Sequence, residues 1–352
     1  MSEAAGASAF DLRQLDYELP EERIAQAPLE ERESARLLCL VRDGTLAHRS
    51  VRDLPDLLPP SLIVLNDTRV LPARLFGSKP SGGKLELLLF RRLSEPGWSE
   101  RWLALGKGLR VGLSARLAEG ALELEVCARR DDAYEVTLSA ERGVGEVLAQ
   151  HGLLPLPPYI KRLPDTRDAE RYQTVFAVHE GAVAAPTAGL HLSTDLLERL
   201  RARGHELVFV TLHVGPGTFL PLRTESLFEH RLHEEHYTVP EATANAVARA
   251  RAAGRRVLAV GTTVVRALES AATPSGEVRP GEGATTLFIH PPYAFRVVDA
   301  LMTNFHLPRS TLLALVMAFG GVEPVRRAYE AAIGSGYRFY SYGDAMLLGA
   351  AQ

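Results

Sequence analysis

The sequence predicts an α/β fold: a mixed α/β main domain interrupted by an inserted small antiparallel β-barrel domain. Strands and helices alternate in the second half of the chain, which is typical of an α/β layer with parallel strands. Residues 77–150 instead hold short strands separated by turn residues, which is typical of a small antiparallel barrel or sandwich. Four closely spaced prolines in residues 154–164 then predict a rigid extended crossing. We therefore expect a discontinuous α/β domain over residues 1–74 and 153–352 and a barrel domain over residues 75–152.

The length and composition agree with this organisation. A chain of 352 residues exceeds one typical core, so two domains are expected. A hydrophobic content of 46% with 24% charged residues describes an ordinary globular protein. No apolar run reaches the roughly 18 residues that a membrane span needs, and the N-terminus lacks the basic start of a signal peptide. We expect a cytoplasmic protein with no membrane partner.

Charge and cysteine content narrow the functional classes. The net charge of −3 argues against a general nucleic-acid coat but is compatible with a local basic patch. Cys39 and Cys127 are the only cysteines, which excludes a disulfide framework and a cysteine-based zinc site. His230, His233 and His236 do not match the spacing of the known zinc helices, so we expect no metal.

The first half of the chain is predicted to consist mainly of strands. A short helix is expected after Pro20, and apolar runs bounded by turn residues predict buried strands over residues 36–42 and 61–66. In residues 121–130, Leu and Val alternate with Glu, as expected of a strand with one buried face. The predicted barrel strands cover residues 84–92, 101–106, 110–113, 121–130 and 133–140.

In the second half, cap residues mark the helices. Ser193 or Thr194 caps a helix that Gly204 ends, and Pro240 and Gly254 bracket another. The other predicted elements are strands over residues 206–214, 256–260 and 286–290 and a helix over residues 264–272.

Polar, Gly and Pro residues concentrate in three segments: residues 181–193, 211–219 and 299–313. A core helix does not need His306 and Arg309 at its start, because buried polar groups cost free energy unless they are paired. The segment 299–313 is therefore either a ligand platform or the entrance of a helix capped by Ser310 or Thr311.

Turns at the ends of predicted strands are further candidates, because ligands of open α/β sheets bind beyond the carboxyl ends of the strands. Three such turns are residues 213–219, Gly261–Thr263 and His290–Tyr293. The N–H groups and hydroxyls of Gly261–Thr263 suit a carboxylate or ribose hydroxyl groups. The full dinucleotide fingerprint, the serine nucleophile elbow and the P-loop lysine are absent from the sequence, so the chemistries that depend on them lack their usual signals.

Eight motifs occur in order along nearly the whole chain, from residue 16 to about residue 348. They are NDTRVLPARL, LPLPPYI, YQTVFA, GAVAAPTAGLHLS, TLHVGPGTF, VGTTVVRALES, DALMTNFHLPRSTLL and YRFYSYGDAML. Together they closely resemble the S-adenosylmethionine:tRNA ribosyltransferase-isomerase family of queuosine biosynthesis. The resemblance implies an α/β domain interrupted by a β-barrel, in agreement with the strand pattern.

The resemblance also implies a reaction. The ribosyl part of S-adenosylmethionine would be transferred and isomerised onto 7-aminomethyl-7-deazaguanine in tRNA, giving epoxyqueuosine and releasing adenine and methionine. S-adenosylmethionine is then a consumed co-substrate, and no cofactor is expected. The expected partners are this tRNA and S-adenosylmethionine, and we expect a monomer. Two alternatives stay open: an S-adenosylmethionine-dependent RNA methyltransferase and a non-catalytic RNA-binding protein.

This chemistry needs a proton acceptor near the sulfonium and a donor for departing adenine, roles that histidines suit. The catalytic candidates within the matched motifs are His191, His213, His306 and Asp299. The predicted substrate-binding residues are Thr187, Gly189, Gly215, Gly217, Thr218, Gly261, Thr262, Thr263, Arg266, Thr303, Asn304, Arg309, Asn66, Arg69 and Arg74. Arg266 offers a bidentate fork for the methionine carboxylate, but it also fits the surface of an amphipathic helix. A further group either faces the substrate or ties the two domains together, and it consists of Asn66, Asp67, Arg69 and Arg74.

A basic group that follows the proline-rich segment is the predicted tRNA-binding site. The group consists of Lys161, Arg162, Arg167 and Arg171, and the predicted tRNA contacts are Lys161, Arg162 and Arg171, with Tyr159 as a stacking ring. The alternative is that these are ordinary solvated charges. The tRNA would then be held elsewhere, for instance by the barrel residues Lys79, Lys84, Arg91 and Arg92.

Overall fold

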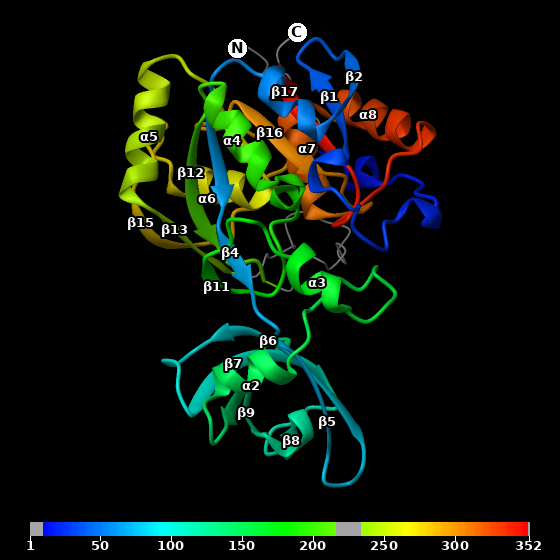
Figure 1. The fold of residues 1–352 in the computed structure, drawn as a ribbon, viewed down its shortest axis with the longest axis vertical. Coiled ribbons are helices and arrows are strands. Elements are labelled where there is room, and N and C mark those ends of the chain that lie inside the picture. The colour runs from blue at the N-terminus through cyan, green and yellow to red at the C-terminus, as the bar shows by residue number, and fades with distance from the viewer. Residues whose placement is uncertain (1–9, 216–233, 351–352) are drawn as a thin grey trace, which may run out of the picture. The chain divides into compact units, whose positions relative to one another are not determined.

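The computed structural model describes residues 10–215 and 234–350, which form two compact units (Figure 1). The first unit comprises residues 1–66, 187–210 and 217–352, and the second comprises residues 67–186 and 211–216. The first holds a large mixed sheet with helices, and the second holds a closed antiparallel barrel. The predicted fold class is confirmed. The boundaries predicted for the two domains stay a prediction.

The main sheet has nine strands in the described residues. In spatial order they are β15 (Gly281–Thr285), β13 (Glu235–Val239), β12 (Glu206–Leu212), β3 (Leu62–Asn66), β14 (Val257–Val260), β16 (Ala300–Asn304), β17 (Ala345–Ala350), β1 (Arg36–Val41) and β2 (Leu46–Ser50). The strands β12, β3, β14 and β16 are parallel, whereas β17 is antiparallel to β16. Every residue of β3 and β14 is buried, as expected of central parallel strands.

The four parallel strands bring their carboxyl ends to one edge of the sheet. The register pairs Val210 of β12 with Asn66 of β3, and Val260 of β14 with Met302 of β16, so these ends lie close to level. Asn304 is the last residue of β16. We call this side of the sheet the carboxyl edge, and it is where the sequence predicts ligand binding.

Helices pack against the sheet in the first unit. They are α1 (Leu54–Leu57), α4 (Thr194–Ala202), α5 (Glu241–Ala252), α6 (Thr262–Ala271), α7 (Thr311–Gly320) and α8 (Val322–Gly334). α5 and α6 contact β3 and β14, α7 contacts β17, and α8 contacts β1 (Figure 1). Two predicted caps are present: Ser193 Oγ accepts from Leu196 N, and Ser310 Oγ accepts from Leu313 N.

The barrel of the second unit closes through six strands. In spatial order they are β10 (Ala133–Ser139), β7 (Ser99–Lys107), β6 (Lys84–Arg92), β5 (Arg74–Ser78), β8 (Ser114–Leu117) and β9 (Leu122–Arg130). In β9, Leu122, Leu124 and Val126 are buried in the barrel core, whereas Glu123 and Glu125 are exposed. The alternation predicted for this strand is therefore confirmed. The helix α2 (Val144–His151), which the sequence did not predict, packs apolar side chains on the same core.

Neighbouring backbone leads into the barrel and out of it. β4 (Thr68–Val70) and β11 (His179–Ala182) form a short parallel pair in the second unit. Nearer the barrel, Arg74 N donates to Leu153 O at 3.0 Å and Leu153 N donates to Arg74 O at 2.9 Å. The helix α3 (Thr166–Arg171) lies on the returning segment, after the proline-rich stretch. The inserted barrel thus begins and ends at one hydrogen-bonded pair.

Three local predictions were wrong. Residues 110–113 form a turn, and β8 begins at the next residue. Residues 286–290 are not a strand, and the Leu287 carbonyl there accepts from Arg266 Nε instead of from a neighbouring strand. The predicted N-terminal helix is a single 3-10 turn, η2 (Glu21–Arg23).

Short 3-10 turns complete the connections. They are η1 (Leu12–Leu15), η3 (Arg32–Ser34), η4 (Val51–Asp53), η5 (Ala118–Gly120) and η6 (Thr187–His191). Across the residues that the structure describes, no helix combines the length and the apolar character that crossing a membrane requires.

Candidate active site

Polar side chains from four elements lie at the carboxyl edge of the main sheet. Asn66 ends β3, Asn304 ends β16, Thr263 lies in the first turn of α6, and His191 ends η6. Asn66 Nδ2 donates to Thr263 Oγ1 at 3.1 Å, and Asn304 Nδ2 lies 3.1 Å from His191 Nε2. Each of the four residues is at most 8% exposed. We call these four residues the edge cluster.

His191 is neutral at ordinary pH. Burial is the main cause that lowers its pKa to about 4, and the guanidinium groups of Arg338 and Arg32 add to the effect. Arg32 is anchored by a hydrogen bond of 3.0 Å to the Leu190 carbonyl. A buried neutral imidazole acts as a hydrogen-bond donor and acceptor rather than as a strong base.

His306 is enclosed by hydrogen bonds and aromatic rings. Its Nε2 lies 2.8 Å from Thr303 Oγ1, and its backbone N donates to the Tyr329 hydroxyl at 3.0 Å. Tyr17 donates its hydroxyl to the His306 carbonyl. Burial lowers the pKa of His306 to about 3, so this residue is a weak base.

Gly261 shapes the turn between β14 and α6. Its φ of 99° lies in the region that favours glycine, and its N donates to the Met302 carbonyl at 2.8 Å. The turn predicted over Gly261–Thr263 is partly helical, since α6 begins at Thr262. Thr262 and Thr263 therefore sit at a helix start on the carboxyl edge, beside Asn66. Such an arrangement suits an anionic or hydroxyl group of a substrate.

A second group of polar side chains lies in the second unit, around the start of β4 and the end of β12. Asp67 Oδ1 accepts from Thr211 Oγ1 at 2.6 Å, and Asp67 Oδ2 lies 3.8 Å from His179 Nε2. Thr68 Oγ1 and His213 Nδ1 are 2.8 Å apart. We call these five residues the junction cluster.

Asp67 is the carboxyl group of the junction cluster. Burial raises its pKa, and the Thr211 hydrogen bond and the charge of His179 oppose that shift only in part. Its side chain is 12% exposed and that of His179 is 60% exposed, so the cluster reaches solvent. A carboxyl group with a raised pKa near water is a candidate proton acceptor. The sequence analysis named Asp67 as facing the substrate or tying the domains together, but it did not place Asp67 among the catalytic candidates.

Gly181 makes room for His213 in this cluster. Its φ of 149° favours glycine, and a Cβ at this position would lie 2.8 Å from two ring atoms of His213. The absence of a side chain at Gly181 therefore sets the position of the imidazole beside Thr68.

Asp299 lies at the opposite end of the sheet strands. Its backbone N donates to Val257 O, and its Oδ2 accepts from Val257 N, both at 2.9 Å. These contacts join the amino ends of β14 and β16. The structure therefore does not bring Asp299 together with His191 or His306.

Arg266 is engaged by the protein itself. The guanidinium is 7% exposed and forms an ion pair with Glu235, and its Nε donates to the Leu287 carbonyl at 3.1 Å. Its Nη2 has no hydrogen-bond partner. The predicted contact with a substrate carboxylate would have to use this remaining nitrogen, and that role stays a prediction.

The other predicted arginines are spread over the chain. Arg69 donates to the Ala177 carbonyl at 3.0 Å, and Arg74 forms a salt bridge of 2.8 Å with Glu86 on the barrel. Arg309 is exposed and has a φ of 52°. Their substrate-binding roles stay predictions.

The remaining predicted substrate residues divide into three groups. Thr187 and Gly189 lie in η6 with His191, and Thr303 precedes Asn304 in β16, so these residues adjoin the edge cluster. Gly215 is the last described residue of its segment. Gly217 and Thr218 lie outside the described residues.

The basic group predicted to bind tRNA is partly neutralised. Arg162 forms two hydrogen bonds with the Asp168 carboxylate, at 2.5 and 2.8 Å, and the Asp168 side chain is fully buried. Lys161 is exposed, whereas Tyr159 and Arg171 are partly exposed. Arg162 therefore organises the start of α3, and its predicted RNA contact competes with this pair.

The histidines that could suggest a metal site are His230, His233 and His236. Residues 10–215 and 234–350 contain no group of three His, Cys, Asp or Glu side chains placed to hold a metal ion. His236 lies 3.4 Å from Glu234, whereas His230 and His233 lie outside the described residues. The expectation that the protein holds no metal stays a prediction.

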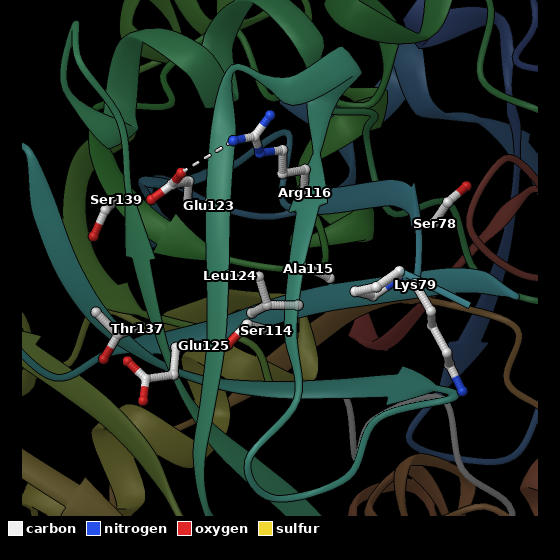
Figure 2. Close-up of a pocket in the computed structure, with 11 residues that line it drawn as sticks. Ser78, Lys79, Ser114, Ala115, Arg116, Glu123, Leu124, Glu125, Thr137 and Ser139 are labelled. Atoms are coloured by element: carbon white, nitrogen blue, oxygen red, sulfur yellow. Dashed lines mark ion pairs between the residues drawn. The ribbon is translucent and has the colours of Figure 1, made fainter. Parts of the chain in front are cut away.

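The barrel carries a groove of about 510 Å³ on its outer surface (Figure 2). Residues of β8, β9 and β10 line it, together with Lys79. Arg116 faces Glu123 at 3.9 Å, and Glu125 extends the acidic side of the groove. The two carboxylates are balanced by the cations of Lys79 and Arg116, so the charge of the groove does not favour a phosphate backbone.

Comparison with known proteins identifies the family. A family model described as queuosine biosynthesis protein matches residues 12–348. The chain belongs to the queuosine biosynthesis protein family. The family predicted from the eight motifs is thereby confirmed.

Relatives in this family extend over the same length. The S-adenosylmethionine:tRNA ribosyltransferase-isomerase of Anaeromyxobacter sp. (strain Fw109-5) is 55% identical over 343 residues, covering 96% of this chain and 98% of the relative. That of Sorangium cellulosum (strain So ce56) is 53% identical, covering 95% and 97%. The crystal structure of an S-adenosylmethionine tRNA ribosyltransferase from Thermotoga maritima is 35% identical, covers 95% and 99%, and has a TM-score of 0.53.

Proposed function

We propose that this member of the queuosine biosynthesis family is a ribosyltransferase-isomerase acting on tRNA. It transfers and isomerises the ribosyl moiety of S-adenosylmethionine onto 7-aminomethyl-7-deazaguanine in tRNA, giving epoxyqueuosine and releasing adenine and methionine. The family match over residues 12–348, with full-length relatives that bear this enzyme name, is the observation that carries the proposal. None of these relatives is named as a methyltransferase or as a binding protein without activity.

The two polar clusters suit different steps of this reaction. The sulfonium makes the neighbouring C5′ hydrogens acidic, and the incoming amine must lose a proton, so proton acceptors are needed. We assign that role to Asp67 and His213 of the junction cluster, because burial raises the pKa of Asp67. The edge cluster provides neutral hydrogen-bonding groups, since the pKa of His191 is lowered to about 4. His306 is left with a structural role.

Lys161 and Arg171 are the side chains we propose for tRNA phosphate contacts, with Tyr159 as a stacking ring. Lys161 is exposed, whereas Arg162 is half-buried and forms an ion pair with the buried Asp168 carboxylate. We further propose a cytoplasmic, monomeric enzyme that needs no cofactor, because the sulfonium already makes its substituents good leaving groups.

The test is a double-label experiment. S-adenosylmethionine labelled in the ribose is expected to place its label in tRNA that carries the aminomethyl base. Methyl-labelled S-adenosylmethionine is expected to leave its label in free methionine. tRNA with ordinary guanine at the same position is the control and is expected to take up neither label. Methyl label in the RNA, with S-adenosylhomocysteine as by-product, would establish a methyltransferase instead.

A further inference from the structure

The side-chain amide of Asn304 is held in one orientation. Its Nδ2 lies 3.0 Å from the Tyr340 carbonyl oxygen and 3.1 Å from His191 Nε2. A carbonyl oxygen can only accept, so the amide atom that faces Tyr340 must be the NH₂ group. Exchanging the oxygen and nitrogen of the amide would bring two carbonyl oxygens together, which repel one another. The hydrogen-bond network therefore decides the orientation.

The carbonyl that fixes Asn304 is itself fixed. Tyr340 has a φ of 72°, a left-handed conformation that is costly for a residue with a Cβ. Its N donates to the Phe305 carbonyl at 3.2 Å, and its carbonyl also accepts from Gly343 N at 2.9 Å. The backbone is therefore strained at the point where it presents an acceptor to Asn304.

The orientation of Asn304 determines the tautomer of His191. Because the NH₂ group donates to Nε2, that nitrogen carries a lone pair, and the single proton of the neutral ring lies on Nδ1. Burial and the charges of Arg338 and Arg32 keep the ring neutral. In the described part of the chain, His191 Nδ1 makes no hydrogen bond. It is also not one of the fully buried polar atoms without a partner, so it is open to solvent or a ligand. A donor is thus available at the carboxyl edge.

The same arrangement leaves one polar atom unsatisfied. Asn304 Oδ1 is buried and has no hydrogen-bond partner. An unpaired buried acceptor is unfavourable, and an apolar side chain of similar size would avoid it. Stability of the core alone therefore gives no reason for an amide here, whereas orientation of His191 does.

We propose that Asn304 is a positioning residue that fixes His191 as a neutral Nδ1–H donor, and that this donor hydrogen bonds to a ring nitrogen of the adenine of S-adenosylmethionine as adenine departs. The inference rests on the proposed function. Adenine leaves with the electron pair of its bond to ribose, so negative charge develops on its ring and a preoriented donor stabilises it. The hydrogen bond transfers no proton, and solvent protonates the released base.

Histidine nitrogen NMR of the full-length protein tests the tautomer without any substrate. His205 is an internal reference with the opposite tautomer. Ser61 N donates to its Nδ1 at 3.1 Å, so the proton of its neutral ring lies on Nε2. Spectra of His191→Asn and His205→Asn assign the two sets of signals. At pH 7 we expect the Nδ1–H pattern for His191 and the Nε2–H pattern for His205. An Nε2–H pattern for His191 would overturn the proposal, whatever the enzymatic activity.

Amide substitutions then test the use of the donor. In His191→Asn the amide nitrogen takes the place of Nδ1, and in His191→Gln it takes the place of Nε2. We expect His191→Asn to keep turnover within about tenfold of the parent and His191→Gln to lose about 100-fold or more, the scale of losing one preoriented donor. The affinity for S-adenosylmethionine should change less than turnover, since the bond strengthens as adenine leaves. Equal losses of turnover in the two variants would sink the assigned role.

His205 supplies the matched control pair, because it is 4% exposed like His191 but lies near Ser61 at the amino end of β3. His205→Asn and His205→Gln are expected to lower stability but to have the same turnover per folded enzyme as each other.

Asn304→Leu tests the positioning role directly. Loss of the amide should remove the pure Nδ1–H pattern of His191, and persistence of that pattern would contradict the role of Asn304. If the parent transfers no ribose label, the proposed function fails while the tautomer measured by NMR still stands.

Discussion

The edge cluster and the junction cluster place histidines in opposite surroundings. His191 is buried at the carboxyl edge beside an amide and two arginines, and its pKa is lowered to about 4. In the junction cluster, burial raises the pKa of Asp67, and the side chain of His179 is 60% exposed. In the proposed reaction, the edge cluster therefore supplies fixed hydrogen-bonding groups and the junction cluster supplies the proton acceptors. The environment, rather than the residue type, divides the roles.

The largest expected effect comes from removing the carboxyl group of Asp67, which belongs to the junction cluster and has no counterpart in the edge cluster. Asp67→Asn keeps the shape and still accepts from Thr211 Oγ1, but it cannot take up a proton. We expect turnover to fall by about 10²- to 10⁴-fold, the range for loss of a general base. Single-turnover release of adenine measures this directly.

The control for Asp67→Asn is Glu180→Gln, which changes an exposed carboxylate on β11 of the same unit. We expect this variant to keep normal turnover and normal binding of S-adenosylmethionine. Normal adenine release by Asp67→Asn would show that the proton acceptor lies elsewhere, and the contrast between the clusters would no longer hold.

Acidification should weaken the folded state through the buried histidines. The folded-state pKa values of His191 and His306 are lowered to about 4 and about 3, whereas an unfolded histidine titrates near 6.5. Between about pH 6.5 and 4 the unfolded chain therefore binds up to two more protons at these two positions, and the lowered pKa of His205 acts in the same direction, so stability falls as the pH falls. The unfolding equilibrium constant should rise by up to about 100-fold per pH unit in this window.

Urea unfolding at several pH values between 6.5 and 5 measures this slope. His306→Asn should reduce it by about one proton, because one of the two groups is removed. The raised pKa values of Asp67 and Asp344 act in the opposite direction, because the folded protein takes up these two protons at a higher pH than the unfolded chain does. A slope that is unchanged in His306→Asn would show that this ring is not kept neutral by burial.

The sequence named most residues of the two clusters but not how they group. His191 and Asn304 lie in segments singled out for their polar residues, and Asn66 lies in a matched motif, yet only the folded chain shows that they share one edge. Asp67 was named as facing the substrate or tying the domains together but not as a catalytic candidate, because its environment, not its neighbours in sequence, raises its pKa. Asp299 was placed with the histidines because it shares their segment, yet a five-residue strand carries it to the other end of the sheet.

The position of His213 can be disturbed without changing its chemistry. Gly181→Ala adds a Cβ that would lie only 2.8 Å from the His213 ring. The ring must therefore move away from Thr68. We expect turnover to fall by about tenfold, because small displacements of a catalytic group are costly. Gly254→Ala is the matched control, with a φ of 65° and open space around its Cβ. Equal turnover in the two variants would mean that the place of His213 does not matter.

A smaller effect is expected from the basic group on the returning segment. Lys161→Ala should weaken tRNA binding a few-fold and flatten its logarithmic salt dependence by about 0.7 to 0.9, as for one lost phosphate contact. Arg162→Ala should leave the salt dependence nearly unchanged and lower stability, because it removes two hydrogen bonds and the ion pair that Arg162 makes with the buried Asp168 carboxylate. Filter binding at several salt concentrations measures both. A flatter salt dependence in Arg162→Ala but not in Lys161→Ala would assign the phosphate contact to Arg162 instead.

Removal of metal ions should have the smallest effect, namely none on ribosyl transfer. The proposed steps use only side chains and the sulfonium, so exhaustive chelation is expected to leave turnover unchanged once the tRNA has been folded. The control restores Mg²⁺ during tRNA folding only. Loss of activity that Zn²⁺ rescues would reopen the metal-binding interpretation of the histidines between residues 230 and 236.

Sequence patterns predicted the elements where local and tertiary preferences agree. The alternation of Leu122 and Leu124 with Glu123 marked a barrel strand, and Ser310 marked the start of α7. Residues 286–290 had the composition of a strand, but a side chain distant in sequence, Arg266, takes one of their carbonyl groups. Competition of this kind is decided by the folded structure and leaves no periodicity in the sequence.

The paired hydrogen bonds between Arg74 and Leu153 have a consequence for protein engineering. Because the chain returns to the point at which it departed, a short glycine linker between Arg74 and Leu153 is the deletion that replaces residues 75–152, and it uncovers Ala73 and Val183, which pack on the barrel core. Loop-closure entropy grows only slowly with length, so such a deletion alters this entropy little. The excised segment, joined end to end through the same two positions, is a natural starting point for circular permutation and for transplanting the barrel onto an unrelated host.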